Sequence, residues 1–458
     1  MKLILTLLVT LCFSLAVAQK TKIYQDRECR CWKLENGNGN GEGEVYSGAK
    51  NDDGNYSRAI FTNAWFCSEA NFIESRFDSV ANFYDSRFDS ETYFRNARFG
   101  SLAYFRRAQF GAPAYFGEAR FDSRSDFGEA RFDSVAIFND VLFNSVAYFR
   151  EARFGALAYF GGSRFGLRAD FWGARFHSQA DFWESRFNSV ANFNAARFDS
   201  LAYFDEARFD SKANFVHARF DGTVSFNKTI LPDTLNFREV KDIATEIDFT
   251  HSVLDSGKTV CYINLVGANI EKIKLAYGTF RLYWTDASHE EKRNTYERLL
   301  RKFQLDGFLE SFQLLSIEYK VYNYTVKAAR SNPIYWQLMN RLDKYWWNYG
   351  YNKELIFRNT LIIFFLFAII NLLSFKYINE NVYKLETIWK KYREYKGKTP
   401  FLNKLYCSLT YTGVIFFGVK FSFEMIRHKN VLAVGYFYLQ YVLGLVCLAY
   451  LFNFVISN

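Results

Sequence analysis

The sequence predicts a parallel β-solenoid, followed by an α-helical segment and an α-helical transmembrane domain. Three observations predict this fold. Phenylalanine recurs at fixed intervals through the first half of the chain, this spacing then gives way to helical spacing, and long uncharged apolar runs lie near the C-terminus. The chain has 458 residues, among them 51 Phe and 31 Tyr, and a net charge of +9. It is long enough for several domains with buried cores.

The N-terminus has the pattern of an export signal. Lys2 precedes an apolar stretch over residues 3–17, and the small residues Ala16 and Ala18 stand at the positions that a signal peptidase requires. Residues 1–18 are therefore predicted to be a cleaved signal peptide, with the following chain exported. An uncleaved anchor helix is the alternative, and it would place the following chain on the same side.

Residues 19–57 are predicted to form a flexible N-terminal segment, because Asn, Gly and Glu fill residues 36–43. The exported part holds four cysteines: Cys29, Cys31, Cys67 and Cys261. An oxidising compartment permits disulfides among them, but the spacing does not define the pairing. No second Cys or His pair accompanies the first two cysteines, so no metal site is expected.

From residue 61 the chain repeats. One phenylalanine recurs every eleven residues without a gap: Phe61, Phe72, Phe83, Phe94, Phe105, Phe116, Phe127, Phe138, Phe149, Phe160, Phe171, Phe182, Phe193, Phe204, Phe215 and Phe226. A second phenylalanine follows each by five residues, from Phe66 to Phe220. Repetition at a fixed short period is typical of solenoids, in which each unit buries its apolar face against its neighbours.

These alternating units of five and six residues resemble the pentapeptide-repeat family. The resemblance rests on triplets such as Ala70-Asn71-Phe72 and Ser75-Arg76-Phe77, and it extends over residues 58–240. It implies a right-handed quadrilateral parallel β-helix with four units per coil, so that two eleven-residue blocks form one coil. Seven or eight coils are expected.

The phenylalanines are predicted to form the solenoid core, each ring stacked on that of the next coil. Representative core residues are Phe72, Phe77, Phe83, Phe88, Phe160 and Phe165. Ala or Ser two residues before each Phe is expected to face inward as well, because inward positions alternate along a strand.

Arginine occupies an outward position in most blocks and is predicted to form a column along the rod. The candidate surface ladder is Arg153, Arg164, Arg175, Arg186, Arg197 and Arg208. This ladder either pairs with neighbouring Asp residues or binds a polyanion. Residues 58–228 carry 21 basic and 21 acidic side chains, so the rod is neutral and lacks the acidic surface of a DNA mimic. No nucleic-acid partner is expected.

Residues 241–285 are predicted to be degenerate repeats that cap the rod. Residues 286–353 are predicted to contain amphipathic helices and an aromatic juxtamembrane segment. The first helix has a capping-box signal at Ser288 and Glu291, and Gly307 marks its end.

Residues 354–458 are predicted to be a membrane domain. Helices are expected over about 355–375 and 431–456, because both runs are apolar, the first nearly long enough to span and the second long enough to cross with tilt. The segment 405–419 is shorter and is interpreted as a re-entrant segment or a third helix. Lysines between the first two segments predict a cytoplasmic loop by the positive-inside rule, which agrees with export of the N-terminal part.

This C-terminal domain resembles the two-helix, potassium-channel-like pore domain found behind pentapeptide repeats in some bacterial proteins. The resemblance rests on Tyr349-Gly350-Tyr351 and on the segment from Leu405 to Leu409. Its filter position is degenerate, and the pore-like segment reads Val414, Ile415, Phe416, Phe417 and Gly418. Bulky residues replace the small ones that a potassium filter needs.

The sequence therefore predicts a membrane-anchored binding or scaffold protein without enzymatic activity, catalytic residues or cofactors. Its expected location is the bacterial inner membrane, with the repeat domain outside the cytoplasm. Expected partners are the membrane, a second copy of the chain, and an unknown protein or polyanion. The alternative function is an oligomeric ion-channel-like pore with a degenerate selectivity filter.

Overall fold

The computed structural model describes residues 21–25, 32–36, 58–378, 400–418 and 431–456. It divides into two units, residues 1–315 and residues 316–458, which are described separately. The predicted signal peptide and the predicted lysine-rich loop lie outside the described residues. Cys67 is disulfide-bonded to a partner outside the described residues, whereas Cys261 is free and buried.

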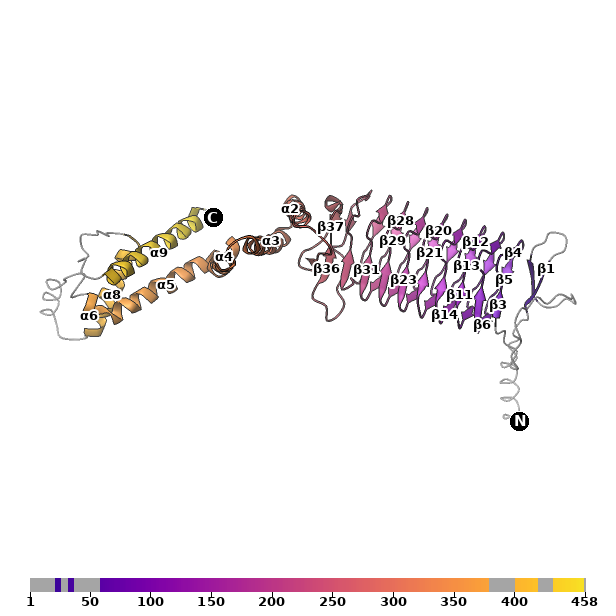
Figure 1. Cartoon of the computed structure of the whole chain (residues 1–458), viewed down its shortest axis with the longest axis horizontal. Coiled ribbons are helices and arrows are strands. Elements are labelled where there is room, and N and C mark those ends of the chain that lie inside the picture. The colour runs from indigo at the N-terminus through magenta and orange to yellow at the C-terminus, as the bar shows by residue number, and fades with distance from the viewer. Residues whose placement is uncertain (1–20, 26–31, 37–57, 379–399, 419–430, 457–458) are drawn as a thin grey trace, which may run out of the picture. The chain divides into compact units, whose positions relative to one another are not determined.

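The first unit is a parallel β-solenoid (Figure 1). Each coil passes in turn through four short strands, one in each of four sheets, which we number I to IV in chain order. Strands of one sheet pair in parallel with strands 22 residues away, as Arg87 pairs with Gln109. Because the chain visits the sheets in the order I, II, III, IV, sheet I lies opposite sheet III and sheet II opposite sheet IV.

Sheet I contains β3 (Arg58–Ile60), β7 (Val80–Asn82), β11 (Ala103–Tyr104), β15 (Ser125–Asp126), β19 (Ala147–Tyr148), β23 (Arg168–Asp170), β27 (Val190–Asn192), β31 (Lys212–Asn214), β34 (Thr234–Asn236), β36 (Cys261–Asn264) and β38 (Phe280–Leu282). Sheet II contains β4 (Trp65–Phe66), β8 (Arg87–Phe88), β12 (Gln109–Phe110), β16 (Arg131–Phe132), β20 (Arg153–Phe154), β24 (Arg175–Phe176), β28 (Arg197–Phe198) and β32 (Arg219–Phe220). An antiparallel hairpin of β1 (Thr21–Gln25) and β2 (Trp32–Asn36) extends sheet II at its N-terminal end.

Sheet III contains β5 (Ala70–Asn71), β9 (Thr92–Tyr93), β13 (Ala114–Tyr115), β17 (Ala136–Ile137), β21 (Ala158–Tyr159), β25 (Ala180–Asp181), β29 (Ala202–Tyr203) and β33 (Val224–Ser225). Sheet IV contains β6 (Arg76–Phe77), β10 (Arg98–Phe99), β14 (Arg120–Phe121), β18 (Leu142–Phe143), β22 (Arg164–Phe165), β26 (Arg186–Phe187) and β30 (Arg208–Phe209). A short pair, β35 (Ile247–Asp248) and β37 (Ile273–Lys274), completes the strands. The solenoid has about 10 turns over residues 59–282, more than the expected seven or eight, because sheet I continues through the segment expected to be a degenerate cap.

The core of the solenoid is a set of phenylalanine stacks. Rings 22 residues apart lie parallel, as for Phe105 and Phe127, whose centroids are 4.7 Å apart at an interplanar angle of 2°. Neighbouring stacks meet edge to face, as for Phe105 and Phe116 at 5.4 Å and 89°. The structure buries the representative core residues Phe72, Phe77, Phe83, Phe88, Phe160 and Phe165. Alanines such as Ala103 are also buried, so each coil is closed around an apolar interior.

The two units of each eleven-residue block turn differently. The residue two positions after the first Phe has a left-handed backbone, as at Glu118 and Glu129 with φ of 60° and 56°. Left-handed backbone is costly for residues with a Cβ, and glycine takes this position at Gly162 with φ of 69°. This turn recurs every eleven residues, which distinguishes the two units of each block.

Helix α2 (His289–Leu305) packs on the C-terminal end of the solenoid, beside the 3-10 helix η1 (Ile270–Lys272). The predicted capping box forms: Ser288 Oγ accepts from the Glu291 N–H, and the Glu291 carboxylate accepts from the Ser288 N–H at 2.7 Å. Lys302 donates to the Glu271 carbonyl at 3.1 Å. The helix covers the last coils with its apolar face, as expected for a solenoid cap.

Helix α3 (Leu309–Arg330) leads into the second unit. There follow α4 (Pro333–Trp347), the 3-10 helix η2 (Asn348–Gly350), α5 (Glu354–Leu373), α6 (Phe375–Ile378), α8 (Pro400–Phe416) and α9 (Val431–Ile456). Two of these helices are long and apolar enough to cross a membrane, α5 over Glu354–Leu373 and α9 over Val431–Phe452.

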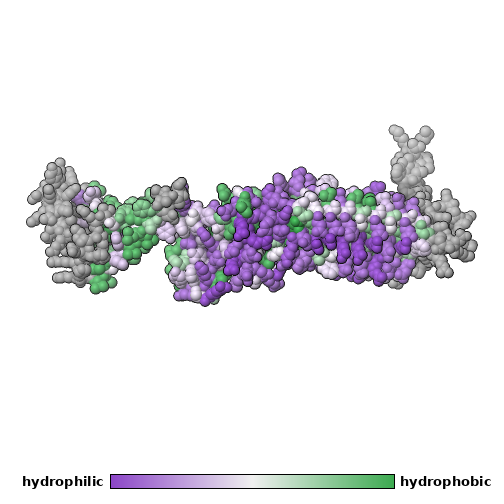
Figure 2. Space-filling model, turned by 90° about the horizontal axis from the view of Figure 1, so that it is seen from above, coloured by the Kyte–Doolittle hydropathy of each residue, from purple (hydrophilic) through white to green (hydrophobic). Residues whose placement is uncertain are grey.

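The surface of the second unit differs from that of the solenoid. In Figure 2 the solenoid face in view is mainly hydrophilic, whereas hydrophobic residues gather over the described parts of the C-terminal helices. On α5, the side chains of Ile362, Phe365, Leu366 and Ile369 are more than half exposed. Exposed apolar surface of this kind is typical of a helix that contacts lipid.

Candidate functional sites

The predicted arginine column is two ladders on opposite sides of the solenoid. Arg153, Arg175 and Arg197 lie on sheet II, in β20, β24 and β28. Arg164, Arg186 and Arg208 lie on sheet IV, in β22, β26 and β30. The single-column prediction was wrong because a coil contains two eleven-residue blocks, so arginines eleven residues apart are on opposite sheets.

The arginines of these ladders differ in their partners. Arg197 and Arg208 each pair with the Asp two residues on, at 2.6 Å in both cases. In the middle coils this Asp is replaced by Gly, His or Asn. Within the described part of the chain, no ion pair is found for four of the arginines: Arg153, Arg164, Arg175 and Arg186. The middle coils therefore carry arginine charge that the solenoid itself does not neutralise.

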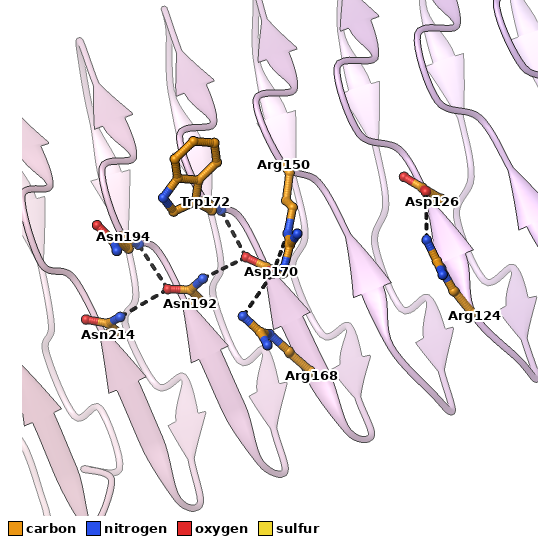
Figure 3. A network of polar contacts seen from close by, with 9 residues as sticks. All are labelled: Arg124, Asp126, Arg150, Arg168, Asp170, Trp172, Asn192, Asn194 and Asn214. Carbon is orange, nitrogen blue, oxygen red and sulfur yellow. Dashed lines mark hydrogen bonds and ion pairs between the residues drawn. The ribbon is translucent and has the colours of Figure 1, made fainter.

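Sheet I carries a hollow in these same middle coils, which we call the arginine hollow. It is lined by Arg106, Arg124, Asp126, Gly128, Glu129, Tyr148, Arg150, Glu151 and Trp172, with a volume of about 260 Å³. Asp126 of β15 and Tyr148 of β19 form its floor, and Asp170 of β23 lies next in the same 22-residue register. Figure 3 shows four of the lining residues, Arg124, Asp126, Arg150 and Trp172, together with the polar network of Asp170 beside them.

Asp170 is the most heavily bonded residue of this region. Its side chain is completely buried, and Oδ2 accepts from Arg150 at 2.7 Å and lies 3.0 Å from the Arg168 guanidinium. Oδ1 accepts from Asn192 Nδ2 at 2.7 Å (Figure 3). A buried carboxylate is tolerated only when paired and hydrogen-bonded. Asp170 thereby fixes the guanidinium group of Arg150 at one edge of the hollow and also pairs with Arg168.

Tyr148 lies between two guanidinium groups. Those of Arg124 and Arg150 are 4.7 and 4.9 Å from its ring centroid, a cation–π arrangement. Arg124 also pairs with Asp126 at 3.2 Å, and Asp126 accepts from the Gly128 N–H at 3.0 Å. The two guanidinium groups remain about half exposed, so their outer N–H groups can still donate to a ligand.

The opposite sheet carries the same local sequence without this network. Ala169-Asp170-Phe171-Trp172 on sheet I recurs eleven residues later as Ala180-Asp181-Phe182-Trp183 on sheet III. Asp181 accepts from the Trp183 N–H at 2.9 Å, and no ion pair to it is found among the described residues. Burial raises the pKa of the Asp181 carboxyl, and the charge of Asp205 adds to this effect. The arginine hollow therefore depends on residues of neighbouring coils, not on the local motif.

Comparison with known proteins identifies the repeat. Residues 72–119, 94–142, 138–186 and 182–230 match the family described as pentapeptide repeats (9 copies). The solenoid is built of pentapeptide repeats. No curated protein and no solved structure matches the chain. The matched region contains the arginine hollow and both arginine ladders, whereas the strands continue beyond it to β38.

The second candidate site is the packing of α8 between α5 and α9. Thr412 of α8 lies beside Asn371 near the end of α5, and Phe416 lies beside Phe364, nearer the middle of α5. Helix α8 therefore runs antiparallel to α5, and it ends beside the middle of that helix. Thr412 also contacts Gln440 of α9, and Phe416 contacts Cys447, so α8 runs in the same direction as α9.

A buried polar cluster joins these three helices. Asn371 Nδ2 donates to Thr412 Oγ1 at 2.8 Å, and the Tyr436 hydroxyl donates to Asn371 Oδ1 at 2.8 Å. Gln440 Nε2 donates to the Thr412 carbonyl at 3.2 Å. Asn371, Thr412 and Gln440 are almost completely buried. Hydrogen bonds of this kind hold apolar helices together where the hydrophobic effect between them is weak.

The pore-like segment is helical. Val414, Ile415 and Phe416 form the last turn of α8, with Phe416 completely buried. The Phe417 N–H donates to the Gly413 carbonyl at 3.0 Å, and the Gly418 N–H donates to the Ile415 carbonyl at 3.2 Å. A potassium filter presents its carbonyls to a central axis. Here the Ile415 carbonyl of this segment instead accepts a hydrogen bond at the end of the helix.

Sequence reasoning missed the arginine hollow and the buried polar cluster. The signal for the hollow is the alternation of Tyr104, Asp126, Tyr148 and Asp170 along one column of sheet I, and it emerges only in the 22-residue register. The signal for the cluster is the presence of Asn371 and Gln440 within otherwise apolar runs. Across the described ranges, no group of His, Cys, Asp and Glu is arranged to hold a metal ion.

Proposed function

We propose that the chain is a membrane-anchored binding scaffold. In this proposal α5 and α9 anchor the chain in the bacterial inner membrane, and the exported solenoid takes a partner at the arginine hollow. The observation that carries it is the hollow itself, where half-exposed guanidinium groups of Arg124 and Arg150 flank Tyr148. The exposed apolar side chains of α5 support the anchor. No catalytic role is assigned.

The chemistry of the hollow favours a partner with an anionic group. Guanidinium groups bind carboxylates and phosphates through paired N–H groups, and Trp172, 41% exposed at the rim, offers a flat apolar surface. The lining itself balances three arginines with the carboxylates of Asp126, Glu129 and Glu151, and the excess positive charge comes from Arg153 and Arg175 on the adjoining sheet II, for which no ion pair is found among the described residues. The partner is therefore expected to be an acidic protein surface or another polyanion.

The test is site-specific photocrosslinking in intact membranes. A photoreactive phenylalanine analogue replaces Trp172 at the hollow or, as the matched control, Trp183 on the opposite sheet; the two side chains are 41% and 47% exposed. We expect a crosslinked species from position 172 that is lost on Arg124→Ala with Arg150→Ala and retained on Arg197→Ala. Equal crosslinking from both positions, or none from position 172, contradicts the proposal.

One observation favours an ion-channel-like pore as a second candidate function. Helix α8 starts at the end of the bundle where α5 ends and where α9 begins, and it stops beside the middle of α5. This arrangement supports a re-entrant helix. A pore would need several copies of the chain around an axis. Reconstitution in planar bilayers with a potassium gradient tests it: selective currents abolished by Phe416→Ala would favour the pore over the scaffold, and silence would leave the scaffold.

A further inference from the structure

Helix α4 has an apolar face that is largely exposed. Its side chains are Ile334, Tyr335, Leu338, Leu342 and Tyr345, which are between 46% and 78% exposed. Spacings of four, four and three residues from 334 to 345 place them on one side of the helix. No residue of α4 is buried.

The opposite side of α4 is held in place, so its orientation is defined. Tyr324 of α3 donates to Asp343 at 2.5 Å, and the Tyr349 hydroxyl donates to Asn340 at 2.7 Å. Lys327 lies 4.7 Å from the ring centroid of Trp336. The packed residues 336, 340, 343 and 347 recur every three or four positions. The exposed apolar face is therefore a stable feature of a helix packed on its other side.

The position of α4 points to a lipid surface as the occupant of this face. Asn359, in the first turns of α5, donates to the Tyr345 carbonyl at 2.7 Å. Trp346 and Trp347 pack against Tyr450 of α9, with centroids 5.8 and 5.1 Å apart. The end of α4 thus lies where α5 begins and where α9 approaches its end, which is the level of the lipid headgroups if both helices span.

The charge around this face fits the same occupant. Residues 320–358 contain seven basic side chains and two acidic ones, a net charge of +5 (7 − 2). Arg341 and Lys344 are both exposed, Arg341 at the border of the apolar face and Lys344 beyond that border. An amphipathic helix with aromatic and aliphatic residues on one side and cations on the other is typical of a helix that lies in the membrane interface.

We propose that α4 lies flat on the membrane surface, with Ile334, Leu338, Leu342 and Tyr345 among the upper acyl chains and its cations at anionic headgroups. This inference rests on the proposed membrane anchor. It adds a second contact with the bilayer, which would fix the direction in which α3 leaves the membrane.

The test uses the full chain, reconstituted in phosphatidylcholine and phosphatidylglycerol vesicles, with an environment-sensitive fluorophore on a single cysteine. The three positions are Leu338→Cys on the apolar face, Gln337→Cys on the polar side as matched control, and Phe365→Cys on α5. All seven native cysteines, Cys12, Cys29, Cys31, Cys67, Cys261, Cys407 and Cys447, are replaced by Ala in all three variants. Lipids brominated near the headgroup or near the chain end act as quenchers of known depth.

We expect the Leu338 probe to be quenched severalfold more than the Gln337 probe by shallow bromines, and the Phe365 probe to be quenched by deep bromines. A Leu338 probe that stays in water while the Phe365 probe is deeply quenched overturns the inference on α4 and leaves the anchor intact. A Phe365 probe in water overturns the anchor. A dehydrated Leu338 probe that no brominated lipid quenches indicates a second copy of the chain on this face, and it too overturns the inference.

Discussion

In the solenoid, Phe105 and Phe127 are completely buried against one another and the charged side chains face mainly outward, whereas in the bundle of α5, α8 and α9 the character of the surface is reversed. There Phe365 and Leu366 are more than half exposed, and the polar side chains of Asn371 and Gln440 are buried beside apolar residues such as Phe416. One chain thus contains a solenoid with a polar surface and a helix bundle with an apolar surface and polar groups in its core.

The difference between the two surfaces indicates which solvent, water or lipid, each part contacts. In water, burial of apolar area drives folding, and each regular coil of the solenoid contributes four inward phenylalanines and four small inward residues, mostly alanine, to that burial. In lipid, apolar side chains gain nothing from burial, so helices associate through close packing and hydrogen bonds. The cluster around Asn371 supplies such bonds. The reversal therefore supports the membrane anchor independently of helix length.

The largest expected effect is in the solenoid core. Phe160→Asp would place an unpaired carboxylate between rings 4.9 and 5.0 Å away on either side. Burying such a charge costs several kcal/mol, so the coils around it should open. Limited proteolysis of the purified protein measures this, with Arg164→Asp on the exposed ladder as control. Unchanged protease resistance would contradict the stacked core.

A smaller effect is expected in the bundle. Asn371→Leu removes the hydrogen bonds to Thr412 and Tyr436 and should destabilise the bundle by about 1–2 kcal/mol. Unfolding in mixed micelles with increasing SDS measures this loss. Ile370→Leu, at a partly exposed neighbour, serves as control. If the two variants unfold alike, the cluster does not hold α8 between α5 and α9.

The smallest expected effects on stability concern surface carboxyls, and their sign differs between a carboxyl with an ion pair and one without. Burial acts to raise the pKa of Asp199, but hydrogen bonds from His177 and Arg197 outweigh it and leave the pKa lowered. Its stabilising contribution is therefore present above the unfolded pKa of about 3.9 and is lost as the pH falls through the folded value. The contribution of Asp181 to stability has the opposite sign. Its pKa is raised in the folded state, so the charged form is disfavoured there.

Asp199→Asn should therefore lower the stability at pH 7 by less than about 1 kcal/mol, and Asp181→Asn should raise it slightly. Both differences should vanish at acid pH, where the carboxyls are protonated in the folded and unfolded chain. Thermal unfolding of the purified repeat protein between pH 3 and pH 7 measures them. Shifts of the same sign for both variants would show that the two sides of the rod are not electrostatically distinct.

The solenoid could be predicted from the sequence because each coil repeats the same local constraints. Phenylalanine spacing determines which residues are inward, and the capping box at Ser288 marks the start of α2. The arginine column was predicted wrongly, since eleven residues are half a coil and not a whole one. The arginine hollow could not be predicted locally, because Asp170 obtains its partners Arg150 and Asn192 from the coils before and after its own. The cluster around Asn371 depends on tertiary packing of three helices, for which the sequence has no periodic signal.

The central claim is that the solenoid lies outside the cytoplasm and that the bundle holds it at the membrane. Labelling of intact cells with a membrane-impermeant thiol reagent tests this most directly, with a single cysteine at Trp172 of the solenoid or at Lys391 between α6 and α8. Permeabilised cells, in which both cysteines should react, provide the control. The account predicts that Trp172→Cys reacts in intact cells and that Lys391→Cys does not. Labelling of Lys391→Cys alone would contradict it.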